Sequence, residues 1–244
     1  EEINYIVDMG AKIKFNHRIE SMKDLLDNGA FDAVFVGTGA PRGKELKLPG
    51  RYDSENIYIG IDWLESVAFE HAKSIGEKVL IIGVGNTAMD CCRTSLRLHA
   101  KDVKVMARKP RAFFKSSDWE LEDAEEEQVE ILINHSPKEF VVEDGKLIGM
   151  KFDQMEYKID DEGNIDRGSA VGEVFIHCDD VILAIGQENA FPWIERDIGI
   201  EFNEWDCPIV DETTMMCSRE GVFFGGDAAF GPKNIIWGVA HGHE

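Results

Sequence analysis

The hydrophobic residues of the 244-residue chain form short unbroken runs that alternate with stretches of helical spacing. The clearest runs are 31–37 and 78–83, and each ends on a glycine, as is typical of strands buried in a parallel sheet. In chain order, the pattern of the middle region predicts a helix at 62–74, a strand at 78–83, a helix at 86–100, a strand at 102–107, an acidic helix at 118–128 and a strand at 129–133. This alternation of strand and helix indicates an α/β fold.

Other segments predict elements around that unit. Alternation of apolar and polar residues on both sides of Asp144-Gly145 indicates an antiparallel hairpin. The pattern also predicts strands at 11–15, 172–178, 180–186 and 222–226 and helices at 1–9 and 234–244. We expect Ile3, Ile6 and Val7 to form the apolar face of the first helix, and Asp62 to be the N-cap of the helix at 62–74.

Composition and charge narrow the class of partner. The chain has 26 Lys and Arg against 47 Asp and Glu, so its net charge is 26 − 47 = −21. An acidic surface repels phosphate backbones and anionic lipids, so we expect neither nucleic acid nor a membrane as a partner. No apolar run approaches the roughly 20 residues of a membrane span, and no signal-peptide pattern is visible. We therefore expect a cytoplasmic location.

The five cysteines, Cys91, Cys92, Cys178, Cys207 and Cys217, include no Cys-x-x-Cys pair. Their odd number fits reduced and mostly buried thiols. The adjacent Cys91 and Cys92 are better interpreted as small side chains on a buried helix than as a strained disulfide. The absence of a closely spaced redox pair argues against a reductase of the glutathione or thioredoxin type.

A glycine-rich turn carries the sharpest chemical signal. Gly83-x-Gly85-x-x-Ala88 follows a predicted strand and opens a predicted helix, which is the context of a dinucleotide-binding loop. Gly83 permits the tight turn, Gly85 lets a pyrophosphate approach the backbone, and Ala88 keeps the helix close to the strand. The alternative is a glycine turn with no ligand.

The end of the next predicted strand selects the dinucleotide. An NAD site usually places Asp or Glu there, to bind the ribose 2′-hydroxyl. This chain has Arg108, Lys109 and Arg111 and no acidic residue. Because cations bind a 2′-phosphate, we expect NADP(H), and the alternative is a basic turn that faces solvent.

Several long segments in one order resemble a known family. GVGNTAMDCCRTSLRLHA is similar to the GGGNTAMDAARTALRLGA-type segment of the glutamate synthase small-chain family. INYIVDMGAKIKFN, FDAVFVGTGAPRGKELKLPG, VILAIGQEN and WDCPIVDETTMMCSREGVFFGGDAAFGP also resemble segments of that family. Its members are FAD- and NADPH-using oxidoreductases, and the reductase half of dihydropyrimidine dehydrogenase is similar to them. The family's first FAD glycine fingerprint and its iron–sulfur region are absent from these residues.

The resemblance implies a Rossmann-like NADPH-binding domain inserted into a partial FAD-binding domain. Residues 1–60 and 187–244 would then be segments of the FAD domain, and 61–186 the NADPH domain. The implied NADPH-binding residues are Gly83, Gly85, Asn86, Thr87, Ala88, Arg108 and Lys109. Near FAD, the resemblance implies Gly226, Asp227, Asn234 and Ile235, and further cofactor-binding candidates are Thr38, Gly39 and Gly186.

The implied activity is hydride transfer from NADPH to FAD, with electrons passing to a partner such as the glutamate synthase large chain or an iron–sulfur protein. No catalytic side chain is expected, because the two cofactors carry the chemistry. We expect the 244 residues alone to bind NADP(H) without turnover. The alternatives are a non-catalytic NADP-binding or scaffold module, and the reductase component of ferredoxin or pyrimidine reduction. The isolated histidines and the acidic helix suggest no metal site or other special role.

Overall fold

The computed structural model of the chain describes residues 2–29 and 31–243. Two compact units are present: 40–188, here called the middle unit, and a second unit formed by the segments that flank it. The sequence placed the first boundary at residue 60. The structure moves it to residue 39, because β3 (Ile57–Ile59) pairs with β10 (Asp180–Leu183) inside the middle unit. The other boundary, at residue 188, lies close to the expected one.

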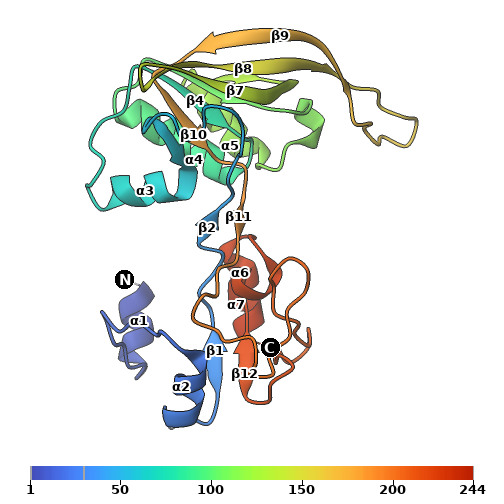
Figure 1. The fold of residues 1–244 in the computed structure, drawn as a ribbon. Helices are drawn as coiled ribbons and strands as arrows, with labels where there is room; N and C mark the ends of the chain where they lie inside the picture. The colour runs from blue at the N-terminus through green and yellow to red at the C-terminus, as the bar shows by residue number, and fades with distance from the viewer. Residues whose placement is uncertain (1, 30, 244) are drawn as a thin grey trace. The chain divides into compact units, whose positions relative to one another are not determined.

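A five-stranded sheet forms the centre of the middle unit (Figure 1). Its order is β3-β10-β4-β5-β6, with β4 at Lys78–Ile82, β5 at Asp102–Met106 and β6 at Glu130–Leu132. Every neighbouring pair is parallel. The predicted parallel sheet and the α/β class are therefore confirmed.

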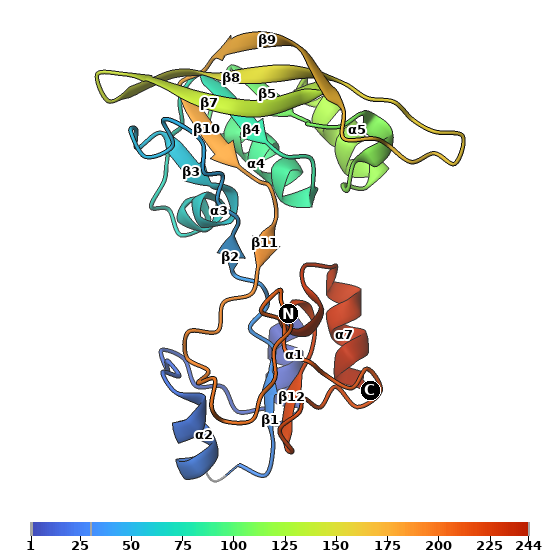
Figure 2. The ribbon, with the colours of Figure 1, turned by 45° about the vertical axis from the view of Figure 1, so that its right-hand side comes forward.

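The two faces of this sheet are covered differently. One face carries α3 (Gly60–Ala68), α4 (Asn86–Arg97) and α5 (Asp118–Glu126), and the other carries the antiparallel strands β7 (His135–Glu143), β8 (Lys146–Glu156) and β9 (Ser169–His177) (Figure 2). The β7–β8 hairpin turns at Asp144-Gly145, as predicted. The connection 157–168 between β8 and β9 extends away from the sheet.

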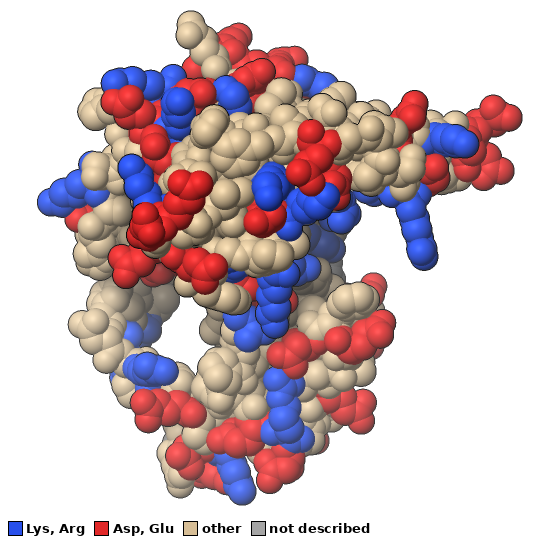
Figure 3. All heavy atoms as spheres, turned by 45° about the horizontal axis from the view of Figure 1, so that its top comes forward, with Lys and Arg blue, Asp and Glu red and all other residues tan. Residues whose placement is uncertain are grey.

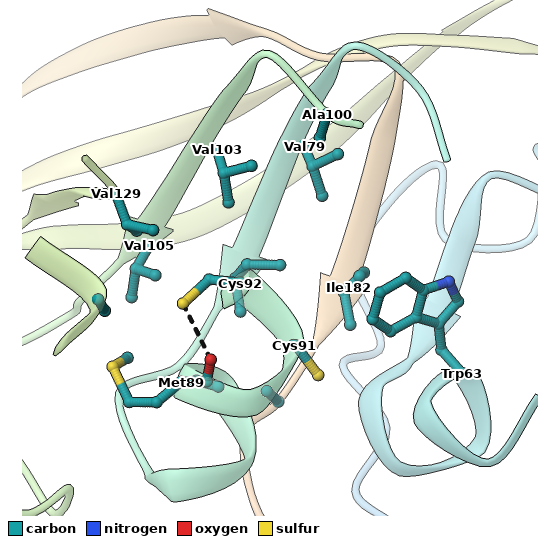
Figure 4. Close-up of a cluster of buried hydrophobic side chains, with 14 of the residues drawn as sticks. Trp63, Val79, Met89, Cys91, Cys92, Ala100, Val103, Val105, Val129 and Ile182 are labelled. Carbon is teal, nitrogen blue, oxygen red and sulfur yellow. Dashed lines mark hydrogen bonds between the residues drawn. The ribbon is translucent and has the colours of Figure 1, made fainter. Parts of the chain in front are cut away.

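Alternate side chains of β4 explain why its sequence is apolar without interruption. Val79 and Ile81 pack toward the helices, in a cluster with Met89 and other residues of α4. Figure 4 shows Val79 and Met89 in this cluster. Leu80 and Ile82 pack toward the antiparallel strands. Both faces of the strand are thus removed from water, which favours a continuous hydrophobic run.

The cysteines are free, and all but Cys207 are buried. Cys91 and Cys92 lie on α4, and the Cys92 thiol donates to the carbonyl oxygen of Met89 at 3.1 Å (Figure 4). Burial raises the pKa of Cys92 to about 12 and that of Cys91 still further. The interpretation of this pair as small core side chains is confirmed.

The second unit has a smaller sheet, the parallel pair β1 (Val34–Val36) and β12 (Val222–Phe224). Its helices are α1 (Glu2–Asp8), α2 (Met22–Asn28), α6 (Asp227–Phe230) and α7 (Ile235–His243). Met22, Phe191 and Phe224 belong to its core. The short strands β2 (Arg42–Gly43) and β11 (Gln187–Glu188) and the 3-10 turn Arg111–Phe113 lie in the middle unit.

Some predicted elements were wrong. Residues 11–15 form no strand, and no described segment pairs with them. The helix predicted at 62–74 begins at Gly60 with Ile59 as its N-cap, so Asp62 lies in the first turn, where its charge faces the positive end of the helix dipole. The expected apolar face of α1, with Ile3 and Ile6, is exposed. Neither α2 nor β3 was predicted.

Charged side chains of both signs are interspersed on the face shown in Figure 3. On the antiparallel sheet, Lys138 binds Asp153 at 2.8 Å and Glu173 at 2.6 Å, which links all three strands. Among the described residues, no three His, Cys, Asp or Glu side chains are grouped to hold a metal ion. None of the described helices has both the length and the apolar composition needed to cross a membrane.

One buried carboxylate connects three parts of the middle unit. Asp180, at the start of β10, is 2% exposed. Its oxygens accept hydrogen bonds from Asn56 Nδ2 at 2.7 Å and from the backbone N–H of Gly76 at 2.6 Å. These donors precede β3 and β4, the two strands that flank β10 in the sheet. Asp180 therefore fixes the points at which the chain enters both strands.

We predict that Asp180→Ala lowers the free energy of unfolding by about 2–3 kcal/mol, because it leaves two donors to a charged acceptor without a partner. Urea unfolding measures the change. Asp161→Ala is the control, since Asp161 is exposed and accepts no hydrogen bond from a described residue, and its effect should stay within about 0.5 kcal/mol. A similar loss in both variants would contradict this role of Asp180.

Candidate functional site

The carboxyl ends of the parallel strands bring the predicted loop and cations together at one edge of the middle unit. Gly83 follows β4, and Arg108 follows β5, the neighbour of β4 in the sheet. On its other side β4 pairs with β10, which comes about a hundred residues later in the chain. The strand order therefore reverses at β4, and in open α/β sheets ligands bind at such a point.

Gly83 is required by the packing of the protein itself. Its φ is +125°, and a Cβ atom there would lie 2.2 Å from the carbonyl oxygen of Ala184. Its N–H donates to the carbonyl oxygen of Met106 at 3.1 Å. Gly83 thus lets the chain turn closely between the ends of β5 and β10.

Gly85 differs, because nothing in the protein requires a glycine there. It is the N-cap of α4, with an extended backbone (φ −101°, ψ 177°) that any residue adopts. A Cβ atom on Gly85 would have no neighbouring atom within 4 Å. The space in front of this residue is open, so packing within the protein does not account for the glycine.

The first turn of α4 offers hydrogen-bond donors to that space. The amides of Ala88 and Met89 bond to the carbonyl oxygen of Gly85. The amides of Asn86 and Thr87 donate to no described residue. Ala88 is fully buried against the sheet, which keeps the helix close to β4. A helix N-terminus of this kind binds phosphate.

The three cations after β5 are not equivalent. Arg111 forms a two-pronged ion pair with Glu125 of α5, one contact being 2.9 Å, and Arg111 lowers the pKa of that carboxyl. Arg108 is exposed and Lys109 is half-buried, and neither forms an ion pair with a described residue. These two cations are therefore available to an anion.

Sequence reasoning missed two contacts that hold this edge. The hydroxyl of Tyr157, in the connection after β8, donates to the carbonyl oxygen of Arg108 at 2.6 Å, and burial raises the pKa of Tyr157. The N–H of Ser116 donates to the carbonyl oxygen of Val84 at 3.2 Å. Tyr157 lies 49 residues from Arg108, and no local spacing signals their contact.

In the second unit, the structure brings Thr38-Gly39 and Gly226-Asp227 to one edge. These pairs follow β1 and β12, whose parallel register sets Val36 opposite Phe224. Gly226 has φ +58° and ψ −147°, a conformation that favours glycine. The Asp227 carboxylate is half-buried, and its Oδ1 accepts from the N–H of Lys233 at 2.9 Å.

The other predicted cofactor-binding residues lie in other segments of the chain, namely Asn234, Ile235 and Gly186. Asn234 precedes α7, and its carbonyl oxygen accepts from the N–H of Trp237 at 3.1 Å. Ile235 opens the helix with its side chain 86% exposed. Gly186, in the middle unit, has φ +112° and accepts from the N–H of Lys44 at 2.9 Å.

A buried amide, also missed by the sequence analysis, supports the turn after β12. Asn189 is 3% exposed, and its Nδ2 donates to the carbonyl oxygen of Ala228 at 3.0 Å. Its Oδ1 has no hydrogen-bond partner among the described residues. Asn189 therefore holds the first turn of α6 next to Asp227.

Curated relatives match along most or all of the chain. It is 29% identical to the "NADPH-Fe(3+) oxidoreductase subunit beta" of Geobacter sulfurreducens, covering 100% of this chain and 40% of that protein. It is 32% identical to the "NADP(+)-dependent formate dehydrogenase subunit beta" of Moorella thermoacetica, covering 100% of this chain and 35% of that protein. For the "Glutamate synthase [NADPH] small chain" of Azospirillum brasilense the identity is 29%, covering 87% and 47%. The chain thus spans less than half the length of these relatives.

Solved structures share the fold. FprA from Mycobacterium tuberculosis in complex with NADPH superimposes with a TM-score of 0.71 at 16% identity, covering 91% of this chain and 63% of that one. Thioredoxin reductase from T. acidophilum superimposes with a TM-score of 0.66 at 20% identity, covering 86% of this chain and 62% of that one. The model of one family, described as pyridine nucleotide-disulphide oxidoreductase, matches residues 4–242. With nearly every residue inside that match, the chain belongs to the pyridine nucleotide-disulphide oxidoreductase family.

Proposed function

We propose that this chain is a module of an NADPH-dependent flavin oxidoreductase, which passes hydride from NADPH to FAD and electrons to a partner subunit or domain. The observation that carries the proposal is the edge formed by Gly85 and α4. There, the space at Gly85 is open, the amides of Asn86 and Thr87 donate to no described residue, and Arg108 and Lys109 form no ion pair with a described residue, which supports a site for a phosphorylated dinucleotide.

The choice of NADP(H) depends on charge at the end of β5. An acidic residue there would accept from a ribose 2′-hydroxyl and repel a 2′-phosphate. Arg108 and Lys109 instead offer positive charge that no described carboxylate neutralises. The Geobacter and Moorella relatives carry NADPH or NADP(+) in their names, which supports the same choice.

The second unit supplies residues that fit FAD. Gly226 provides the glycine-favouring backbone of the turn, and only one oxygen of Asp227 is bonded to a described residue, so the carboxylate retains an acceptor for a ribityl hydroxyl. Gly39 lies at the same edge, and a Cβ atom there would meet no atom within 4 Å. Bound FAD would accept hydride and release single electrons. The first amides of α7 would stabilise negative charge beside it.

The chain's own side chains favour electron transfer over disulfide chemistry. Four of its five thiols are buried, and Cys207 has no neighbouring cysteine in the sequence. Each curated relative named above is a subunit or chain of a larger oxidoreductase, which supports an electron-accepting partner. A glutamate synthase large chain and an iron–sulfur protein are the candidates we propose.

Spectroscopy of the purified full-length protein tests this function. We expect a flavin absorption band that bleaches on addition of NADPH under anaerobic conditions and returns with an electron-accepting dye. Binding of NADPH without any flavin band would favour the alternative, a non-catalytic NADP-binding or scaffold module.

We predict that Gly85→Ala weakens NADP(H) binding at least about tenfold, because its methyl group occupies the space through which the pyrophosphate approaches. The free energy of unfolding should stay within about 0.5 kcal/mol, since the backbone is extended and the site is open. Gly83→Ala is the contrast: its strained backbone and clash should cost about 1–3 kcal/mol of stability. Isothermal titration and urea unfolding separate the two effects. Unchanged binding in Gly85→Ala would exclude this loop as the pyrophosphate site.

We predict that NADPH binds more tightly than NADH, and that replacing both Arg108 and Lys109 with Ala removes about 1–3 kcal/mol of that preference, the scale of charged hydrogen bonds. Arg111→Ala is the matched control, because Arg111 is already paired with Glu125. The Arg111→Ala variant should prefer NADPH over NADH nearly as strongly as the unsubstituted protein. Equal affinities for NADPH and NADH in the unsubstituted protein would rule out a 2′-phosphate site here.

We predict that Asp227→Ala in the full-length protein lowers FAD occupancy while NADPH affinity stays nearly unchanged. The reason is that the two candidate sites belong to different compact units. The ratio of flavin absorbance to protein absorbance, with titration of NADPH, measures both quantities. Loss of both together would instead indicate a role of Asp227 in folding.

A further inference from the structure

A histidine that the sequence analysis left without a role contacts the turn after β12. The backbone N–H of Gly226 donates to Nδ1 of His241 at 3.0 Å. His241 lies on α7 and is only 9% exposed. Its ring packs against Phe230, with ring centres 4.4 Å apart, and lies 6.1 Å from the ring of Trp237. The imidazole is therefore held in place next to the turn.

The backbone of Gly226 makes this contact close. A Cβ atom on Gly226 would lie 3.5 Å from the Cα atom of Gly238, so α7 crosses directly beside the turn. A Cβ atom on Gly225 would lie 3.4 Å from Cβ of His241. Both glycines thus allow α7 to bring the imidazole within hydrogen-bond distance.

The contact requires one form of the imidazole. A ring nitrogen accepts a hydrogen bond only when it carries no proton, so Nδ1 must be bare and the ring proton must be on Nε2. A protonated imidazole would direct an N–H at the N–H of Gly226, which removes the bond and adds repulsion. The geometry of the turn therefore depends on a neutral His241.

We propose that His241 is a positioning residue for the candidate flavin site, where its bare Nδ1 holds the Gly226–Asp227 turn in the conformation that presents the Asp227 carboxylate to FAD. The inference rests on the proposed function, because it takes this turn to be part of the FAD site. It adds a requirement that the function alone does not contain, namely that flavin affinity depends on a hydrogen-bond acceptor at residue 241.

Few charged or titratable residues lie on the elements around this imidazole. Asp227 opens α6, Lys233 lies in the connection before α7, and His243 ends α7 itself. The strands β1 and β12 contribute only apolar residues. His243 is exposed, and its backbone and side chain make no hydrogen bond that would place it at the turn. His243 is the other histidine of α7, so it needs its own control.

The experiment compares three variants of the full-length protein by titrating the deflavinated form with FAD and following flavin fluorescence at pH 8. His241→Phe keeps an aromatic ring without an acceptor. In His241→Asn, Oδ1 is separated from Cα by as many bonds as Nδ1 of histidine, so an acceptor is kept at the same distance along the side chain. His243→Asn controls for the neighbouring histidine.

At pH 8 we expect His241→Phe to bind FAD about tenfold more weakly, the scale of one lost hydrogen bond, and His241→Asn to stay within about threefold of the unsubstituted protein. His243→Asn should bind FAD as tightly as the unsubstituted protein.

The outcomes separate the inference from the function on which it rests. If His241→Phe and His241→Asn weaken FAD binding equally, His241 has only a packing role and the inference is overturned. Tight FAD binding by His241→Phe would also overturn it. Weakening by His243→Asn as large as that by His241→Phe would also overturn it. If the unsubstituted protein binds no FAD at pH 8, the proposed flavin site fails and the inference fails with it.

Discussion

Burial of the parallel sheet on both faces is the constraint from which the middle unit follows. Because Val79 and Ile81 must meet the helices while Leu80 and Ile82 meet the antiparallel strands, β4 cannot shift by one residue without exchanging its two faces. That register fixes where each strand ends. The loop after β4 and the cations after β5 therefore meet at one edge, although 23 residues separate Gly85 from Arg108 in the sequence.

The two loop glycines show how packing and ligand requirements can be separated. Gly83 is explained entirely by the protein, through its positive φ and the carbonyl oxygen of Ala184. Gly85 has neither a special φ nor a close neighbour, so packing within the chain does not explain its lack of a side chain, and we propose that the open space admits a ligand. Gly39 also has no close neighbour, but its φ of +72° by itself favours glycine, and α7 approaches Gly226 closely, so this reasoning holds for Gly85 and does not extend to these two residues.

Local patterns were sufficient for elements whose burial is periodic or continuous, such as β4, β5 and the hairpin at Asp144-Gly145. They failed at 11–15, where a short alternation finds no strand to pair with among the described residues, and at β3, whose pairing with β10 joins segments more than 120 residues apart. The glycine loop and its cations could be predicted because their spacing is local. The contacts of Tyr157 and Asn189 could not, because they join residues 49 and 39 positions apart.

The electrostatics of the candidate nucleotide site depend on local pairing rather than on net charge. A chain with net charge −21 repels an anionic dinucleotide at long range, but at physiological ionic strength charges beyond about 8 Å are largely screened. Within that distance, what matters is which cations are already neutralised. Glu125 forms an ion pair with Arg111, whereas Arg108 and Lys109 form no ion pair with a described residue. The acidic helix α5 therefore neutralises Arg111. The 2′-phosphate specificity that we propose comes from Arg108 and Lys109, which are not neutralised in this way.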